Sequence, residues 1–333
     1  MIIMWSEKVP YISFAQIKKA RERIKGTINK TPCIYSLPLT RMMGKEIYLK
    51  LENLQVTQAF KTRGNTNKIG LLNKEQKKRG VIAASSGNHG QGLSLAALRN
   101  GVKAVIVLPE AASSNKVEKI KENKAEVIIK GKTYDDASNY AHSLSRKIGY
   151  TYIPSFDDPD IIAGNGSMGL EILEEVPQTQ MIICPIGGGG GISGISLAAK
   201  QIKPDIQIIG VEAERSASML ESVKAGKIVE LPSADTFADG IAVRKPGKLN
   251  FEIVKRYVDK IVTVSEEEMK SAIVTLAKEG KIVAEGAGAS SVAALLFRKF
   301  AVEDITNIVC LITGGNIDMS LFESILNEYG KNS

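Results

Sequence analysis

In the stretch Met181-Ile-Ile-Cys-Pro-Ile-Gly-Gly-Gly-Gly-Gly-Ile192, an apolar run ends directly on five consecutive glycines. The run has the length and composition of a buried strand, and residues 193–202 continue with a helical pattern. Glycines between a strand and a helix let the backbone approach a ligand, and the free N–H groups of the helix start suit a phosphate. A flexible linker would not begin directly on a hydrophobic strand. The stretch therefore predicts a strand–turn–helix unit with a phosphate-binding turn.

Similar alternation of apolar runs and helical patterns extends over most of the 333 residues. Continuous Val- and Ile-rich runs are typical of parallel strands covered on both faces. We therefore expect an α/β protein of two lobes, each a largely parallel twisted sheet flanked by helices. The predicted strands are 47–52, 81–85, 104–108, 127–129, 181–186, 206–212, 261–264 and 308–313. The predicted helices are 15–25, 62–79, 91–99, 114–123, 135–148, 193–202, 266–279 and 290–300.

The composition narrows the class of function. The formal net charge of +8 would favour anionic small molecules, whereas 5% aromatic residues and a single Trp argue against stacking on nucleic-acid bases. Two histidines and three separated cysteines argue against a zinc site or a disulfide framework. No segment has the length of a membrane span, and the start has no secretory pattern. We expect a cytoplasmic protein without nucleic-acid or membrane partners; a non-enzymatic basic binding protein is a distant alternative.

A second candidate site is the turn Ser85-Ser-Gly-Asn-His89, which follows the predicted strand 81–85. Free N–H groups and two hydroxyls at a helix start would bind an anion such as a carboxylate. A helix cap alone needs only one serine. The four polar side chains within these five residues therefore favour a binding function.

Lys61 stands at the start of a predicted helix, after Phe60. A lysine at the positive end of a helix and away from water has a lowered pKa, which makes its amine a nucleophile able to form a Schiff base. Taken alone, Lys61 is better explained as an ordinary surface lysine. Beside a phosphate site and a carboxylate site it supplies a covalent anchor. Thr313 would place a hydroxyl at the end of the predicted strand 308–313, although a turn alone would also explain it.

A dinucleotide site is an alternative for the glycine-rich turn. Gly189, Gly191 and Gly194 match the spacing of the dinucleotide fingerprint, and Glu212 lies about 20 residues further on, where an acid would bind ribose. This interpretation predicts an NAD-dependent oxidoreductase. It leaves the turn at residues 85–89 without a function.

Together these segments resemble the fold-type II pyridoxal-phosphate enzymes, and within them the threonine/serine dehydratase and serine racemase branch, over residues 17–326. The resemblance rests on Leu51-Glu-Asn-Leu-Gln55, Phe60-Lys-Thr-Arg-Gly64, Ser85-Ser-Gly-Asn-His89, the run 187–190, Ala238-Asp-Gly-Ile-Ala-Val243 and Thr313-Gly-Gly-Asn316. It implies a tryptophan synthase β-like fold. A small mobile domain, 68–157, would be inserted between two parts of a large domain, 1–67 and 158–333.

The resemblance also implies a role for each matching residue. Lys61 would bind pyridoxal 5'-phosphate and act in catalysis, with Phe60 against the cofactor ring, Asn88 on its hydroxyl and Thr313 facing its nitrogen. Further implied cofactor-binding residues are Gly187, Gly188, Gly189, Gly190, Gly240 and Glu285. The substrate carboxylate would bind at Ser85, Ser86, Gly87, Asn88 and His89.

The reaction implied is the dehydration of L-threonine or L-serine to 2-oxobutanoate or pyruvate plus ammonia, with 3-hydroxyaspartate also open as a substrate. Lys61 would remove the α-proton. The hydroxyl of Ser86 is the racemase-like choice, so an amino-acid racemase with Lys61 and Ser86 as opposed bases stays open. Glu212 matches one of two acids that bind a divalent cation in some members, but Ser218 stands at the second position. Members are usually dimers or tetramers, so we expect a homodimer or homotetramer.

Overall fold

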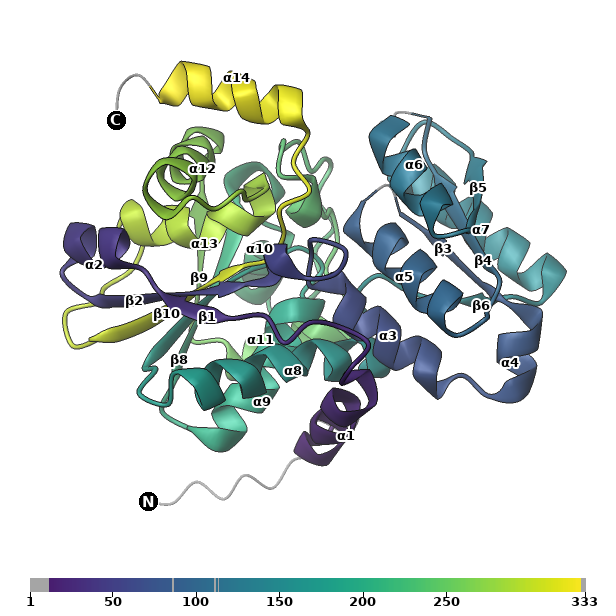
Figure 1. The fold of residues 1–333 in the computed structure, drawn as a ribbon, viewed down its shortest axis with the longest axis horizontal. Coiled ribbons are helices and arrows are strands. Elements are labelled where there is room, and N and C mark those ends of the chain that lie inside the picture. Colours follow the sequence, from purple (N-terminus) through teal and green to yellow (C-terminus); the bar gives the residue numbers. More distant parts are fainter. Residues whose placement is uncertain (1–11, 86, 111, 113, 331–333) are drawn as a thin grey trace.

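The structure is a computed structural model that describes residues 12–85, 87–110, 112 and 114–330. Two sheets form its centre (Figure 1). The six-stranded sheet has the order β1 (Cys33–Tyr35), β2 (Glu46–Leu51), β10 (Asn307–Ile312), β7 (Met181–Pro185), β8 (Gln207–Ala213) and β9 (Lys260–Val264). The four-stranded sheet has the order β5 (Glu126–Ile129), β4 (Ala104–Leu108), β3 (Val81–Ala84) and β6 (Thr151–Tyr152).

All neighbouring strands pair in parallel except β1, which runs antiparallel to β2. The fold is therefore the predicted α/β arrangement of two largely parallel sheets. The smaller sheet takes its strands from residues 81–152, and the larger sheet takes strands from both sides of that segment. The strands of the smaller sheet are therefore consecutive in the chain and interrupt the strands of the larger sheet.

Helices cover both faces of each sheet (Figure 1). In the large lobe, the side chain of Ile183 packs with those of α12 (Glu266–Gly280) and α13 (Gly286–Leu296). The next side chain back along the strand, Ile182, packs with α8 (Pro159–Glu175) and α9 (Gly190–Ile202) on the other face. This alternation explains why β7 has no polar face, since both of its sides are buried.

The other helices complete the two lobes. They are α1 (Phe14–Ile24), α2 (Leu37–Met43), α3 (Lys61–Leu71), α4 (Lys74–Arg79), α5 (Asn88–Arg99), α6 (Ser114–Glu122), α7 (Tyr134–Ile148), α10 (Ser218–Ala225), α11 (Lys248–Tyr257) and α14 (Met319–Tyr329). Three 3-10 turns, η1 (Glu52–Leu54), η2 (Glu214–Ser216) and η3 (Asp239–Ile241), lie between them. In the described part of the chain, no helix is long and apolar enough to cross a membrane.

One predicted helix was wrong, and five helices, α2, α8, α10, α11 and α14, were not predicted. The helix predicted over 62–79 is divided into α3 and α4, because Asn73 is extended and its side chain caps α4 by accepting from the N–H of Gln76. The 17-residue helix α8 was not predicted. Residues 161–173 of α8 are all buried, so the helix lacks the polar face that would reveal its period.

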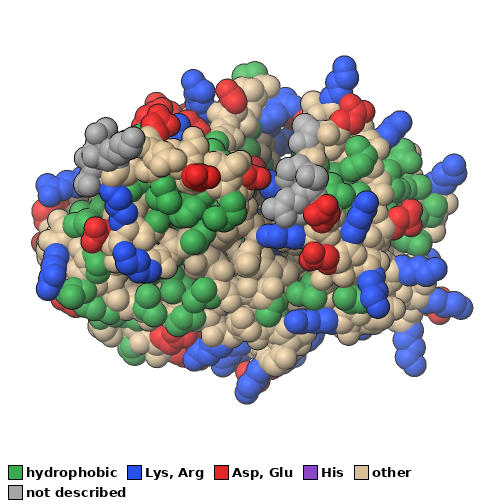
Figure 2. Space-filling model, turned by 45° about the horizontal axis from the view of Figure 1, so that its top comes forward, with side chains coloured by type: hydrophobic (Ala, Val, Ile, Leu, Met, Phe, Trp, Pro, Cys, Tyr) green, Lys and Arg blue, Asp and Glu red, His purple; other side chains and the backbone are tan. Residues whose placement is uncertain are grey.

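Lys and Arg side chains are spread among Asp and Glu side chains over the visible face (Figure 2). The net positive charge is thus not gathered into one patch on that face.

Candidate functional site

The predicted site residues come together at the carboxyl ends of β2, β3, β7 and β10. In parallel sheets the turns that follow the strands meet at this edge, where ligands bind. Several contacts join the turns that follow β2 and β10. The N–H of Phe60 donates to the carbonyl of Thr313 at 3.0 Å, and Ala59 forms an isolated bridge with Gly314. The turn after β3 joins them through the side chain of Asn88, which accepts a hydrogen bond from Asn316.

Lys61 is the first residue of α3 and is half-buried. Its Nζ donates to the carbonyl oxygen of Ser155 at 3.1 Å and lies 5.3 Å from the centre of the Phe60 ring. Burial lowers the pKa of Lys61 from 10.5 to about 8, although the Glu285 carboxylate acts in the opposite direction. Roughly a tenth of this amine is therefore neutral at pH 7, in the form that a nucleophile or a base requires.

The glycine-rich turn leads from β7 into α9. Gly189 has a φ of +97°, and no side chain caps the helix that follows it. A Cβ on Gly188 would lie 2.3 Å from the ring of Phe156, so at this position the chain's own packing excludes a side chain. The first N–H groups of α9 have no acceptor within the helix. These N–H groups are the ones that the sequence predicts to bind a phosphate.

Thr313 follows the last residue of β10, and its side chain is buried. Its Oγ1 has no hydrogen-bond partner among the described residues. A buried hydroxyl without a partner is unfavourable, so this atom is available for a hydrogen bond to a bound group.

The turn after β3 presents backbone N–H groups at the start of α5. The hydroxyl of Ser85 accepts from the N–H groups of Gly87 and Gly90 and so shapes the turn. The Nε2 of His89 contacts the carbonyl oxygen of Ile153 at 3.1 Å, so this ring nitrogen carries the proton and donates. Burial and nearby Lys61 lower the pKa of His89 to about 3, which keeps the ring neutral. Ser86 lies outside the described residues.

Glu285 immediately precedes α13 and is buried. Its Oε1 accepts from Nδ2 of Asn88 at 2.7 Å. Burial raises the pKa of Glu285 to about 7, and the Asp239 carboxylate adds to the effect. Gly240, in η3, lies against it, since a Cβ there would be 3.4 Å from Oε1 of Glu285.

The carboxylate of Glu212 is already used for hydrogen bonds within the chain. Its two carboxylate oxygens accept from the N–H groups of Met219 and Leu220 at 2.9 and 2.8 Å, so the side chain caps the start of α10. A ribose or a metal ion would have to displace both hydrogen bonds. Over the described ranges there is no group of three His, Cys, Asp or Glu side chains that could hold a metal ion.

Sequence reasoning missed two neighbours of the site, Ser155 and Phe156. They follow β6, which has only two residues and therefore gives no recognisable strand pattern. The motif at residues 313–316 gives no role for Asn316. In the structure its Nδ2 donates to both the carbonyl oxygen of Thr57 and Oδ1 of Asn88.

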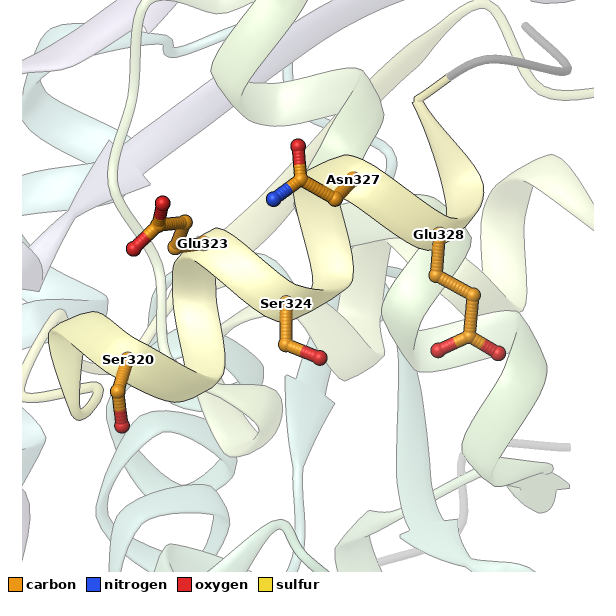
Figure 3. A pocket seen from close by; sticks show the side chains of 5 residues that line it. All are labelled: Ser320, Glu323, Ser324, Asn327 and Glu328. Atoms are coloured by element: carbon orange, nitrogen blue, oxygen red, sulfur yellow. The ribbon is translucent and has the colours of Figure 1, made fainter.

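A recess elsewhere contains none of the predicted residues. It is lined by Ser320, Glu323, Ser324, Asn327 and Glu328, all on α14 (Figure 3).

The fold and the site define a class of two-lobed α/β protein in which a lysine of lowered pKa lies near the starts of two helices, α5 and α9, whose N-cap residues make no side-chain cap hydrogen bond. Comparison with known families identifies the class further: the family described as "Pyridoxal-phosphate dependent enzyme" matches residues 24–314. The chain belongs to this family. The expected family, its fold and its cofactor, pyridoxal phosphate, are thereby confirmed.

Individual relatives cover nearly the whole chain. The chain is 45% identical to the L-threonine ammonia-lyase of Thermotoga maritima over 95% of this chain and 79% of the relative. It is 41% identical to the "L-threonine dehydratase catabolic TdcB" of Staphylococcus aureus, over 96% of this chain and 93% of the relative. Among solved structures, maize serine racemase is similar with a TM-score of 0.90 and 33% identity, covering 96% of this chain and 99% of that one.

Proposed function

We propose that this protein is an L-threonine/L-serine ammonia-lyase that eliminates water from the substrate and releases 2-oxobutanoate or pyruvate plus ammonia. The observation that carries the proposal is the position of Lys61, a half-buried amine with its pKa lowered to about 8 beside two anion-binding helix starts. The two relatives described above, named as a threonine ammonia-lyase and a threonine dehydratase, support this choice of reaction.

Two features of the site fit pyridoxal phosphate. The start of α9 has no side-chain cap, so Gly187, Gly188, Gly189 and Gly190 would hold the phosphate. The unpartnered hydroxyl of Thr313 would meet the ring nitrogen. Phe60 would pack against the ring.

Asn88 and Glu285, at the starts of α5 and α13, complete the proposed cofactor site. Asn88 would bind the ring hydroxyl, and Glu285, through its hydrogen bond to Asn88, would keep that amide oriented. Gly240 would leave room beside them, because a side chain there would meet Ala287 at 2.9 Å.

Bound pyridoxal phosphate withdraws electrons from the α-carbon of an attached amino acid and makes its hydrogen acidic. Lys61 would accept this proton, since its amine is partly neutral at working pH. The neutral hydroxyl of Thr313 does not supply a proton as a carboxylic acid would. This difference favours prompt loss of the β-hydroxyl over amino transfer.

The substrate carboxylate would bind at residues 85–89. The ring of His89 is directed to Ile153, so His89 would contribute its backbone N–H rather than its imidazole. Ser85 and Gly87 would shape the turn, and Asn88 would add a further N–H from the first turn of α5.

A racemase is the second candidate, supported by the similarity to maize serine racemase. In that case Ser86 would act as a base on the face of the substrate opposite Lys61. We further propose domain limits of 1–67, 68–157 and 158–333, a cytoplasmic homodimer or homotetramer, and a role in isoleucine biosynthesis or threonine catabolism.

The test is the release of 2-oxo acid from L-threonine and L-serine, with solvent deuterium incorporation followed in the recovered amino acid. A lyase gives 2-oxobutanoate or pyruvate at a rate far above racemisation. Deuterium in both enantiomers of serine, with little oxo acid, would instead establish the racemase. Ser86→Ala separates the two, because only the racemase needs this hydroxyl as a base.

A further inference from the structure

We propose that the ion pair between Glu52 and Arg63 is a brace that positions Lys61, so that both are positioning residues for the reaction. The inference rests on the proposed function of Lys61. Glu52 begins η1, Arg63 lies in the first turn of α3, and Lys61 stands between them in the chain. The pair therefore closes the segment that carries the lysine.

Arg63 and Glu52 form a bidentate ion pair, which we call the fork. Nε of Arg63 donates to Oε2 of Glu52 at 2.8 Å, and Nη2 donates to Oε1 at 2.8 Å. Two parallel hydrogen bonds between planar groups fix their relative direction as well as their distance. A single-point contact, such as that of a lysine ammonium, would leave rotation free.

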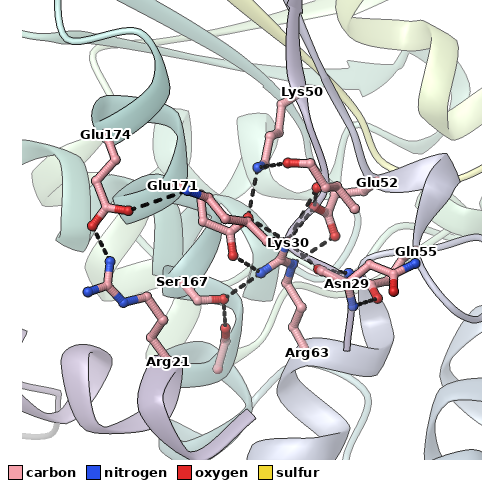
Figure 4. A network of polar contacts seen from close by, with 12 residues as sticks. Arg21, Asn29, Lys30, Lys50, Glu52, Gln55, Arg63, Ser167, Glu171 and Glu174 are labelled. Atoms are coloured by element: carbon pink, nitrogen blue, oxygen red, sulfur yellow. Dashed lines mark hydrogen bonds and ion pairs between the residues drawn. The ribbon is translucent and has the colours of Figure 1, made fainter. Parts of the chain in front are cut away.

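The pair lies in a buried network (Figure 4). Arg63 and Glu52 both have 0% exposure. The guanidinium also donates to both carboxylate oxygens of Glu171 on α8 at 2.7 Å and to the hydroxyl of Ser167 at 3.0 Å. Lys50 on β2 donates to Glu171 at 2.7 Å as well. Two cations thus face two carboxylates from β2, η1, α3 and α8.

Stability alone does not account for these charges. Burying them costs several kcal/mol per ion, and apolar side chains of similar volume often stabilise a fold as well or better. Apolar packing, however, would not fix the angle between η1 and α3. The geometry points to orientation as the contribution of the fork.

The segment from 52 to 63 needs such a constraint. Gln58 has a φ of +56°, an uncommon conformation for a residue with a side chain. No side chain caps α3, and Lys61 places its charge near the positive end of that helix. On this segment, the N–H of Phe60 is held by Thr313, but Nζ of Lys61 reaches across to Ser155 on a different turn.

The experiment compares Glu52→Gln and Arg63→Lys with Lys68→Met. Glu52→Gln keeps the shape and removes the charge, whereas Arg63→Lys keeps the charge and removes the fork. Lys68 is the matched control, because it lies on the same helix and pairs with Asp158 and Asp160 at 2.7 and 2.9 Å without contacting Glu52. The double variant Glu52→Gln/Arg63→Met replaces any single variant that fails to fold.

Two readouts are measured. In the holoenzyme, kcat and KM for L-threonine are determined. In the cofactor-free protein, reductive methylation of Lys61 is followed by mass spectrometry as a function of pH, which does not depend on any reaction of the enzyme. Failure of the proposed function would appear as an inactive wild type, whereas failure of the brace would appear in the methylation profiles.

We expect both fork variants to lose at least about tenfold in kcat with KM changed less than about threefold, because small misplacement of a reacting group is costly. Their methylation midpoint should rise from about 8 toward that of an exposed lysine, with Lys68→Met like the wild type. Fork variants that keep the wild-type kcat and midpoint would overturn the proposal, as would equal changes in Lys68→Met. Failure of the single and double variants to fold would also overturn it, since the network would then serve the fold.

Discussion

Nδ2 of Asn88, at the start of α5, donates to Oε1 of Glu285, next to α13, across 2.7 Å. The two residues are 197 positions apart and belong to different lobes. Asn316 fixes the orientation of the amide, since its Nδ2 donates to Oδ1 of Asn88 at 2.8 Å. The pair therefore connects the two lobes beside Lys61 and holds a buried carboxyl group there.

Stability should depend on pH through Glu285. Its folded pKa of about 7 is above the ordinary 4.5, so the folded protein holds this proton more tightly. The stabilisation is complete below pH 4.5 and is lost as the pH rises through 7, and the difference corresponds to about 3 kcal/mol. Relative to wild type, Glu285→Gln should gain stability as the pH is raised from 5 to 8. Urea unfolding of the cofactor-free proteins measures this, and a constant difference across that range would contradict it.

Covalent capture of pyridoxal phosphate by the cofactor-free protein should quicken with rising pH and level off above about pH 8. The neutral amine is the reactive form, and burial lowers the pKa of Lys61 to about 8. An ordinary lysine would still gain rate near pH 10. Stopped-flow absorbance follows the reaction, with Lys61→Ala as the control that should show no capture at all.

Thr313→Val should separate cofactor binding from stability. The hydroxyl has no hydrogen-bond partner among the residues that the structure describes, so its removal should leave the cofactor-free protein as stable as the wild type or slightly more stable. Loss of one hydrogen bond to the cofactor should weaken its affinity by about three- to tenfold. Thr313→Ser, which keeps the hydroxyl, should bind within about twofold of wild type. Equal affinity in the valine variant would remove Thr313 from the site.

Gly189→Ala should cost both stability and cofactor affinity. Its φ is +97°, and the new Cβ would lie 2.8 Å from Cβ of Asn250. Gly226→Ala is the matched control, with a φ of +67° and open space around the added carbon. We expect about 1–2 kcal/mol of backbone strain in both variants, with a loss of cofactor affinity of at least about tenfold only at Gly189. Thermal unfolding and cofactor titration measure the two effects; similar affinity losses in both variants would argue against the phosphate turn.

Much of the fold could be predicted because its central strands consist of uninterrupted apolar residues. The run at 181–186 and the strand β7 over Met181–Pro185 nearly coincide, since a strand buried on both faces is apolar throughout. The same burial concealed α8, where Gly164, Gly166 and Gly169 allow close contact with α3, α1 and α9 and no polar face remains. A sequence pattern reveals a helix when apolar and polar residues alternate between its two faces. The buried part of α8 has no polar face, so this pattern is missing.

The site was predictable in its turns but not in its contacts. Lys61 and the glycine run are recognisable because each carries its chemistry within a few residues. The hydrogen bond from Asn88 to Glu285 depends on how two lobes meet, and no local pattern encodes it. The hydrogen bond from Nζ of Lys61 to the carbonyl oxygen of Ser155 could not be predicted for the same reason.

The most direct measurement is borohydride reduction of the purified, cofactor-loaded protein, followed by peptide mapping. We expect one pyridoxyl group per chain, on Lys61, and none in Lys61→Ala. Reduced cofactor on another lysine, or a wild-type protein that binds the cofactor without a reducible bond, would contradict the role proposed for Lys61.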